Sequence, residues 1–253
     1  MPRRLGQHFL RTAAARRLVG VIEPGADDVF LEIGAGSGAL TLPLAERCRR
    51  IVGVELDAAL ARGLRKRAPA NVEVVEGDAL ALDLAALLPK GGRVAGNLPY
   101  YVSSPLLRRV LELHAHARDA HLMVQDEVAR RVASPPGSRD YGILSVLFAL
   151  WSDVTIVQRF PPGSFSPPPK VASAVLRIAF RDRPRAEIPS PAAFETLVRT
   201  AFARRRRTLE NNLQDSYPNL KHNLRLLNIA GSRRAETLSV VEFASLARGL
   251  VLE

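Results

Sequence analysis

The stretch Asp28-Val-Phe-Leu-Glu-Ile-Gly34-Ala-Gly36-Ser-Gly38 joins an apolar run directly to three alternating glycines. The apolar run predicts a buried strand, and residues 39–48 after the glycines have the apolar spacing of a helix. Glycine at such a turn lets the backbone approach a ligand closely, where a side chain would collide with it. A strand, a glycine turn and a helix in this order are typical of a nucleotide-type site, although the spacing is not the dinucleotide pattern G-x-G-x-x-G.

The alternation of strands and helices continues along the first half of the chain. A helical pattern at residues 12–22 precedes the first strand. Further apolar runs of strand length, with helical stretches between them, lie at residues 50–55, 72–75, 93–97 and 120–124. Strands that alternate with helices predict an α/β fold with a Rossmann-like, parallel, doubly wound sheet. In such a sheet the ligand site lies at the carboxyl ends of the strands.

The rest of the chain predicts a different organisation. Two helices and then two strands, the strands forming an antiparallel edge, are expected at residues 126–132, 143–151, 155–158 and 172–180. A proline-rich loop, residues 160–170, separates the two strands. Residues 181–191 contain charges and three prolines and are interpreted as a linker, and only helical patterns follow it. The sequence therefore predicts a sheet domain at residues 1–181 and a small all-helical domain at residues 191–253.

Composition restricts the class of protein. The chain has 253 residues, of which 47% are hydrophobic and 24% are charged, as in a soluble globular protein. It has no apolar run of about 18 residues, and residues 1–20 lack the apolar core of a signal peptide. Because Cys48 is the single cysteine, an intramolecular disulfide and a cysteine metal cluster are excluded. We therefore expect a cytoplasmic location, no metal site and no membrane.

The formal net charge of +11 indicates a polyanionic partner. Basic proteins gain affinity for phosphates because counterions are released on binding. No basic amphipathic helix carries Trp or Phe on its apolar face, so a nucleic acid is favoured over a membrane surface.

Acidic side chains stand where the predicted strands end. Glu55 closes the second strand, 21 residues after Gly34, where a carboxylate can accept hydrogen bonds from both hydroxyls of a ribose. Asp78 ends the third strand, where it can accept from an adenine amino group. Glu32, just before the glycines, would lie by the methionyl part of a cofactor. Asp78 and Asp57 would equally serve as helix N-caps, and Asp57 is interpreted as a cap.

The tetrapeptide Asn97-Leu98-Pro99-Tyr100 ends the fourth strand and supplies an amide, a backbone carbonyl and an aromatic ring. If the Asn97 side-chain oxygen and the Leu98 carbonyl each accept one N–H, they hold adenine N6 pyramidal, with its lone pair aimed at an electrophile. Pro99 stiffens the turn and has no N–H to compete. Tyr100 can stack on the base. An ordinary turn at the end of a strand is the alternative for this tetrapeptide.

These stretches together resemble the ribosomal RNA adenine N6,N6-dimethyltransferase family, which uses S-adenosylmethionine to dimethylate two adjacent adenosines near the 3′ end of small-subunit ribosomal RNA. The resemblance covers nearly the whole chain and implies a class I methyltransferase sheet with a small C-terminal helical domain. Besides the motifs already described, it rests on residues 6–10, 103–106, 125–129, 141–145, 165–171 and 202–212. The glycine turn is shared by most methyltransferases of this fold, whereas the combination is specific.

The resemblance implies roles for individual residues. His8 and Leu10 would close over S-adenosylmethionine from the N-terminal arm. The other cofactor contacts would come from Gly34, Gly36, Glu55, Asp78 and Asn97. With Asn97 and Leu98 holding the amine, Phe165 would face Tyr100 across a target adenine that is flipped out of its stack. An aromatic side chain packed on the core is the alternative for Phe165.

The chain departs from the family at three positions. His8 replaces an Asn, Leu5 replaces an aromatic residue, and Tyr101 stands where Asn is frequent. Because His8 still donates or accepts a hydrogen bond, cofactor binding is expected to survive, with an altered pH dependence.

The run Arg204-Arg205-Arg206-Arg207 bears on which substrate the protein binds. A charge run is ordinarily a solvated helix face, but at the start of the helical domain we predict that it binds RNA phosphates. The implied partner is small-subunit ribosomal RNA in the small ribosomal subunit or its precursor, bound by a monomer. A related enzyme acting on an adenine of large-subunit RNA, and an RNA-binding assembly factor without catalysis, are the alternatives.

Overall fold

The computed structural model describes residues 8–251, so Leu5 and the first two residues of the arm motif, Gly6 and Gln7, lie outside the described residues. The chain forms two compact units. One comprises the chain up to Ala129 together with Val154–Phe180, and the other comprises Arg130–Asp153 together with the chain from Arg181 onward.

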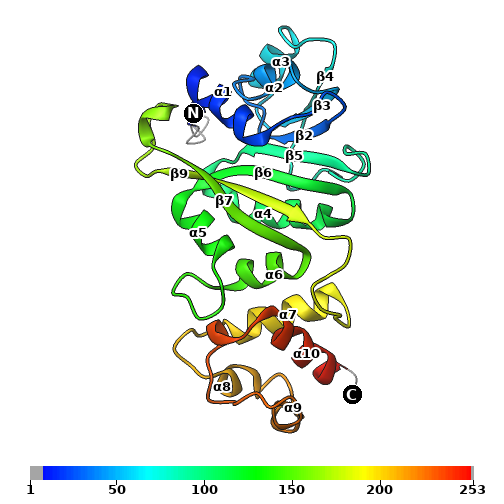
Figure 1. The fold of residues 1–253 in the computed structure, drawn as a ribbon, viewed down its shortest axis with the longest axis vertical. Coiled ribbons are helices and arrows are strands. Elements are labelled where there is room, and N and C mark those ends of the chain that lie inside the picture. The colour runs from blue at the N-terminus through cyan, green and yellow to red at the C-terminus, as the bar shows by residue number, and fades with distance from the viewer. Residues whose placement is uncertain (1–7, 252–253) are drawn as a thin grey trace. The chain divides into compact units, whose positions relative to one another are not determined.

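The first unit is built on a seven-stranded sheet in the order β4-β3-β2-β5-β6-β9-β7 (Figure 1). Its strands are β2 (Val29–Ile33), β3 (Arg50–Glu55), β4 (Val72–Glu76), β5 (Gly92–Asn97), β6 (Ala117–Gln125), β7 (Ser152–Phe160) and β9 (Ser173–Phe180). The ladders from β4 to β6 are parallel, and β9 is antiparallel to β6. The predicted α/β sheet is confirmed, with β9 lying inside it and β7 at its edge.

The helices of the first unit follow the predicted alternation. They are α1 (Thr12–Ile22), α2 (Thr41–Ala45), α3 (Ala58–Arg65), α4 (Ser103–Leu111) and the start of α5 (Asp126–Ala133). Helix α2 is shorter than the predicted 39–48. The Asn71 amide donates to the carbonyls of Ala45 and Cys48, at 2.9 and 3.1 Å, and so satisfies the end of this helix from a distant loop.

Helix α6 (Ile143–Trp151) corrects the predicted division of the chain. It is apolar on almost every side, and a helix of that kind must be covered all round. It packs against α7 (Pro191–Ala201) and α10 (Val240–Val251) in the second unit. Residues 130–153, predicted to belong with the sheet, therefore pack with the C-terminal helices.

The second unit is otherwise helical, as predicted. It contains α8 (Leu209–Leu213) and α9 (Leu220–Leu226) besides the three helices just described. The segment interpreted as a linker is held onto this unit, because the Arg181 and Arg185 N–H groups donate to the carbonyls of Trp151 and Leu150, at 2.9 and 2.7 Å. Helix α7 begins at Pro191 after the N-cap Ser190, whose hydroxyl accepts from the Ala193 N–H.

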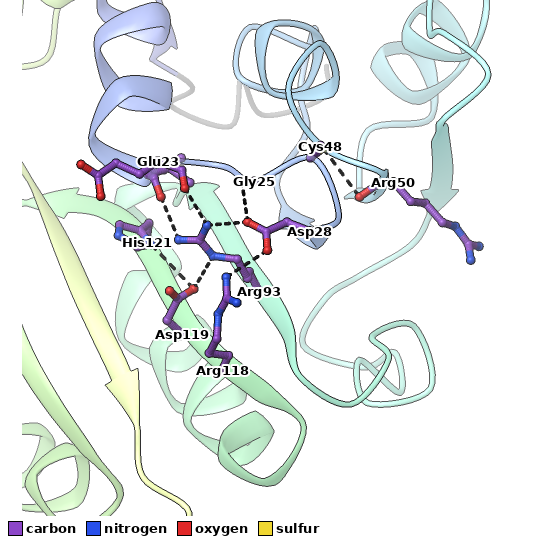
Figure 2. Close-up of polar contacts among 10 residues, drawn as sticks. Glu23, Gly25, Asp28, Cys48, Arg50, Arg93, Arg118, Asp119 and His121 are labelled. Atoms are coloured by element: carbon purple, nitrogen blue, oxygen red, sulfur yellow. Dashed lines mark hydrogen bonds and ion pairs between the residues drawn. The ribbon is translucent and has the colours of Figure 1, made fainter.

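A buried arginine, Arg93 on β5, joins the sheet to the end of α1 (Figure 2). Its guanidinium donates to the carboxylates of Asp28, at 2.7 Å, and Asp119, at 2.8 Å. It also donates to the carbonyls of Ile22 and Glu23, where α1 ends. A cation at the C-terminus of a helix is favourable, because the last carbonyls of a helix lack partners. Arg93 is only 5% exposed. Its hydrogen bonds to Asp119 and Ile22 are buried, and those to Asp28 and Glu23 are partly buried.

Burial and the contacts of Arg93 shift the pKa values of the ionisable side chains around it. Burial by itself raises the pKa of the Asp28 carboxyl. Hydrogen bonds from the Gly25 N–H and from Arg93, together with nearby positive charge, outweigh burial and leave the pKa of Asp28 below its usual value. His121 lies 3.9 Å from Asp119, and burial lowers the pKa of His121 to about 4, so this imidazole is neutral at pH 7.

Candidate functional site

A cavity of about 310 Å³ lies at the carboxyl ends of β2, β3, β4 and β5. This is where a parallel sheet places its ligand site. All but one of the residues predicted for the cofactor or the target base lie on its wall. They are His8, Leu10, Gly34, Gly36, Glu55, Asp78, Asn97, Leu98 and Tyr100.

The glycine turn after β2 has the conformation that its sequence predicts. Gly34 has φ of +77° and Gly38 has φ of +84°, in the left-handed region that side chains rarely adopt. A Cβ on Gly38 would lie 2.5 Å from Cδ1 of Leu64. The Gly34 and Ala35 N–H groups both donate to the Val54 carbonyl, which ties the turn to β3. The backbone therefore forms this part of the cavity wall.

Glu55, at the end of β3, is 4% exposed and already binds the glycine turn. One carboxylate oxygen accepts from the Gly36 N–H at 2.7 Å, and the other accepts from the Asp57 N–H at 2.8 Å. Each carboxylate oxygen accepts two hydrogen bonds, so both retain capacity for a ligand hydroxyl. The Asp57 side chain accepts from the N–H groups of Ala59 and Leu60 and caps α3, as predicted.

Glu32 is fully buried beside the glycine turn and also lines the cavity. Burial raises the pKa of Glu32 to about 8, the charge of Glu55 adds to the rise, and the Thr41 hydroxyl partly offsets it. Among the described residues, Oε2 of Glu32 has no hydrogen-bond partner. At pH 7 this carboxyl is therefore mostly protonated and can act as a donor.

The outer part of the cavity is exposed to solvent. Asp78 follows β4, is exposed, and uses one carboxylate oxygen to accept from the Leu80 N–H at 2.8 Å. Leu56 and Tyr101 also line the cavity, although they are 52% and 55% exposed. The sequence did not lead us to predict that Leu56 lines the cavity. Its position directly after Glu55 was the available signal.

Asn97 is held in a fixed orientation by the N-terminal arm. Its amide nitrogen donates to the His8 carbonyl at 3.0 Å. Its side-chain oxygen is buried and accepts no hydrogen bond from any described residue. An unsatisfied buried acceptor costs about 1–3 kcal/mol, and such atoms are explained most simply by a ligand that donates to them. The predicted acceptor is thus present and available.

Tyr100 lies beside Asn97 with its hydroxyl 2.5 Å from the Ser173 hydroxyl. The aromatic ring next to it is His8, with ring centroids 5.3 Å apart. His8 is itself anchored, because its Nδ1 lies 2.8 Å from the Pro167 carbonyl oxygen. His8 therefore packs on Tyr100 as well as lining the cavity.

Phe165 does not face Tyr100, which corrects the predicted pair of rings. Its side chain has no exposed surface and packs in the core with Leu10, Phe160 and Val175. The physical reason is strand pairing, because β1 (Phe9–Leu10) pairs antiparallel with β8 (Phe165–Ser166). The N-terminal arm thereby covers the proline-rich loop, and Phe165 takes the core position that was its alternative.

The arginine run Arg204–Arg207 lies in the loop between α7 and α8 and is therefore not a helix face. All four side chains are exposed. Helix α8 begins only after the N-cap Thr208, whose hydroxyl accepts from the Asn211 N–H. The Asn212 amide donates to the carbonyls of Ala201 and Arg204 and holds the loop in place.

Nearly the whole chain matches known proteins. The family model for ribosomal RNA adenine dimethylases matches residues 2–250. The chain belongs to the ribosomal RNA adenine dimethylase family. It is 44% identical to the ribosomal RNA small subunit methyltransferase A of Geobacter metallireducens, over 98% of this chain and 94% of that protein. It is 41% identical to the protein of the same name from Xylella fastidiosa, over 96% and 93%.

Solved structures agree with membership of the dimethylase family. A dimethyladenosine transferase from Plasmodium falciparum superposes with a TM-score of 0.78 at 25% identity, covering 94% of this chain and 96% of that one. The 23S rRNA methyltransferase ErmE superposes with a TM-score of 0.69 at 27% identity, covering 96% and 99%. The protein is accordingly an rRNA adenine dimethyltransferase with a class I methyltransferase sheet.

Methyltransferases of this family use S-adenosylmethionine, and the cavity residues fit that cofactor. The glycine turn leaves room for a ligand against the backbone, and Glu55 has acceptor capacity for a ribose. Within the described residues no group of three His, Cys, Asp or Glu side chains is placed to hold a metal ion. None of the described helices is long and apolar enough to cross a membrane.

Proposed function

We propose that this protein transfers methyl groups from S-adenosylmethionine to N6 of two adjacent adenosines near the 3′ end of small-subunit ribosomal RNA. The observation that carries the proposal is the buried, unpaired side-chain oxygen of Asn97 on the cavity wall. The names of the relatives that match nearly the whole chain support the small subunit as the substrate.

The protein contributes to this reaction by positioning the adenine amine. The lone pair of an adenine amine is delocalised into the ring, so N6 is a poor nucleophile. When the Asn97 oxygen and the Leu98 carbonyl accept the two N–H groups, the nitrogen is held pyramidal with its lone pair directed at the methyl group that the cofactor supplies. Tyr100 would stack on the base, which must leave its helix to reach the cavity. After the first transfer one N–H remains, so the pocket must accept a rotated and bulkier amine.

Glu55→Gln should weaken the binding of S-adenosylmethionine by about 10- to 100-fold. The Gln side chain turns an NH₂ group toward one of two backbone N–H donors, and hydrogen bonds to a charged group are worth about 1.5–3 kcal/mol. Titration calorimetry of the purified protein measures the Kd. Glu76→Gln, at the end of the neighbouring β4 and exposed, removes the same charge and should leave the Kd unchanged. Equal Kd values for the two variants would contradict the ribose-binding role.

Replacing Arg204, Arg206 and Arg207 together by Gln should weaken binding to small subunits and flatten its salt dependence. The three exposed side chains make no ion pair with a described carboxylate, so they are available for phosphates. Each phosphate contact contributes about 0.9 to the slope of log Kd against log salt, so the slope should fall by up to about 3. Filter binding at several salt concentrations gives the slope, and an unchanged slope would remove the arginine run from the RNA interface.

The function as a whole is tested by methyl incorporation from labelled S-adenosylmethionine into purified small subunits that lack the modification. Large subunits and naked RNA serve as parallel substrates. Label recovered as N6,N6-dimethyladenosine in the small-subunit RNA alone is the expected result. Label in large-subunit RNA would favour methylation of 23S rRNA, the activity in the name of ErmE. Binding without label would favour an assembly factor without catalysis.

A further inference from the structure

Carboxyl groups line the cavity at the strand ends, although the protein as a whole is strongly basic. The chain has 36 lysines and arginines and a formal net charge of +11. None of the lysines and arginines in the described part of the chain lies on the cavity wall, whereas the side chains of Glu32, Glu55 and Asp78 do. Opposite charges attract more strongly where water is excluded. A wall of this composition therefore favours a positively charged ligand.

The two buried carboxyl groups of this wall, Glu32 and Glu55, differ in their hydrogen bonds. Glu55 accepts from two backbone N–H groups, at 2.7 and 2.8 Å, and such donors stabilise a carboxylate. Glu32 is 1% exposed, and no described N–H or O–H group donates to its Oε2. A buried carboxylate without donors is unfavourable, so the group takes up a proton instead. The negative charge therefore resides on Glu55, and Glu32 is protonated.

No basic side chain among the described residues pairs with Glu32 from the elements packed around it. Its register partners on β3 and β5 are a glycine and an alanine. On α2, the neutral Thr41 hydroxyl is buried and makes no hydrogen bond of normal geometry with a described residue. The ionisable groups near Glu32 are Glu55, whose charge raises the pKa of Glu32, and Cys48, whose own pKa burial raises to about 11. A positive charge that stabilises ionised Glu32 must therefore come from a ligand.

The reaction of the proposed function changes the charge of the ligand in this cavity. S-adenosylmethionine carries a positive sulfonium, and loss of its methyl group leaves a neutral thioether. The ammonium and the carboxylate of the methionyl part are the same in the cofactor and the product. A buried carboxyl group responds to the difference, because a nearby positive charge favours its ionised form.

We propose that Glu32 determines the specificity of the cavity for the positively charged cofactor over the neutral product. The Glu32 carboxyl holds a proton in the empty cavity and releases it to solvent when S-adenosylmethionine binds, and the carboxylate then stabilises the cation. After methyl transfer the positive sulfonium is gone, so Glu32 takes up a proton from solvent and product binding is weakened. The proposal rests on the cofactor of the proposed function and adds a way of limiting inhibition by the product.

Calorimetric titration of the purified protein with cofactor and with product tests this specificity. Glu32→Gln resembles the protonated side chain. At about pH 8.5 it should weaken the binding of S-adenosylmethionine about 10- to 100-fold, and it should change the binding of S-adenosylhomocysteine less than about threefold. The exposed-carboxylate control Glu76→Gln should change neither Kd. Sinefungin, which carries an ammonium group in place of the methylsulfonium, should behave like the cofactor, because the discrimination depends on charge.

The released proton can be counted. Titrations at pH 7 in buffers with different enthalpies of ionisation give the number of protons released on binding, which should be lower in Glu32→Gln by up to about one. In the wild type the affinity for S-adenosylmethionine should rise by up to about tenfold per pH unit between about pH 6 and 8, and then level off. Because His8, Asp78 and the ligand amine are present in both titrations, the difference between the two proteins isolates Glu32.

Thermal unfolding of the empty protein separates a functional carboxyl group from a structural one. Burial raises the pKa of Glu32 from 4.5 to about 8, so the stability of the wild type falls as the pH rises between these values. Glu32→Gln has no such proton to lose. Its Tm should therefore exceed that of the wild type above about pH 6, with a difference that widens toward pH 8. A lower Tm of Glu32→Gln at pH 8 would show that Glu32 is an ionised structural group and would overturn the proposal.

The outcomes also separate this proposal from the proposed function. Equal weakening of cofactor and product in Glu32→Gln, or an unchanged number of released protons, would refute the role of Glu32 in specificity. Label recovered as N6,N6-dimethyladenosine in small-subunit RNA would then still establish the function. Absence of that label would refute the function independently, because the ligand titrations contain no RNA.

Discussion

Asn97→Ala should lower the single-turnover rate of methyl transfer by about 10²–10³-fold, the effect of removing one positioned polar group from a transition state. The variant loses the buried side-chain oxygen that no described residue satisfies. It leaves the exposed arginines of the second unit unchanged, so binding to small subunits should be nearly unaffected. The rate is measured with labelled S-adenosylmethionine at saturation, and the Kd of the enzyme for small subunits is measured separately.

A second substitution separates the two functions of the Asn97 amide. The nitrogen holds the N-terminal arm through the His8 carbonyl, whereas the oxygen is the proposed acceptor. Asn97→Asp retains an acceptor and loses the donor, so it should keep more activity than Asn97→Ala. Equal loss in both variants would indicate that the arm contact is what matters, and a wild-type rate in Asn97→Ala would refute the mechanism.

Arg93→Met should lower the free energy of unfolding by about 3–5 kcal/mol, the usual effect of removing one partner from a buried ion pair. The carboxylates of Asp28 and Asp119 would be left without their shared cation, and the end of α1 would lose its capping donor. Chemical denaturation of the purified protein at pH 7 measures the change. Arg93→Lys keeps the charge with fewer and differently directed donors, so its loss should be smaller.

Arg118→Gln is the matched control for this prediction. Arg118 also pairs with Asp28, at 2.9 Å, but its side chain is 57% exposed. Exposed ion pairs contribute about 0–1 kcal/mol, so this variant should be close to the wild type. Similar losses from Arg118→Gln and Arg93→Met would show that burial of the Arg93 contacts is not what makes them stabilising.

The effect of Arg93→Met should also depend on pH. The folded pKa of Asp28 lies below its unfolded value of about 3.9, so ionised Asp28 stabilises the fold above that pH. This contribution is lost as the pH falls through the folded pKa. The difference in stability between the wild type and Arg93→Met should therefore be largest above about pH 5 and shrink below about pH 4. A difference that grows in acid would contradict the arrangement around Asp28.

Much of the candidate site could be predicted because its signals are local. The left-handed turn at Gly34 and Gly38 requires glycine wherever it occurs, and Glu55 and Asn97 stand at strand ends that hydrophobic periodicity locates. Phe165 could not be placed in this way. Its burial depends on pairing with Leu10, more than 150 residues earlier in the chain, and no local pattern encodes that pairing.

The sequence by itself determined the parallel sheet, the position of the cavity at its strand ends and the family. Each of these follows from the periodicity of apolar residues and from the short motifs at the strand ends. Only the tertiary structure decided that Arg93 caps α1 and that residues 130–153 pack with the C-terminal helices. The physical reason is that these features depend on which distant segments bury their apolar faces together. That choice is made by packing in three dimensions.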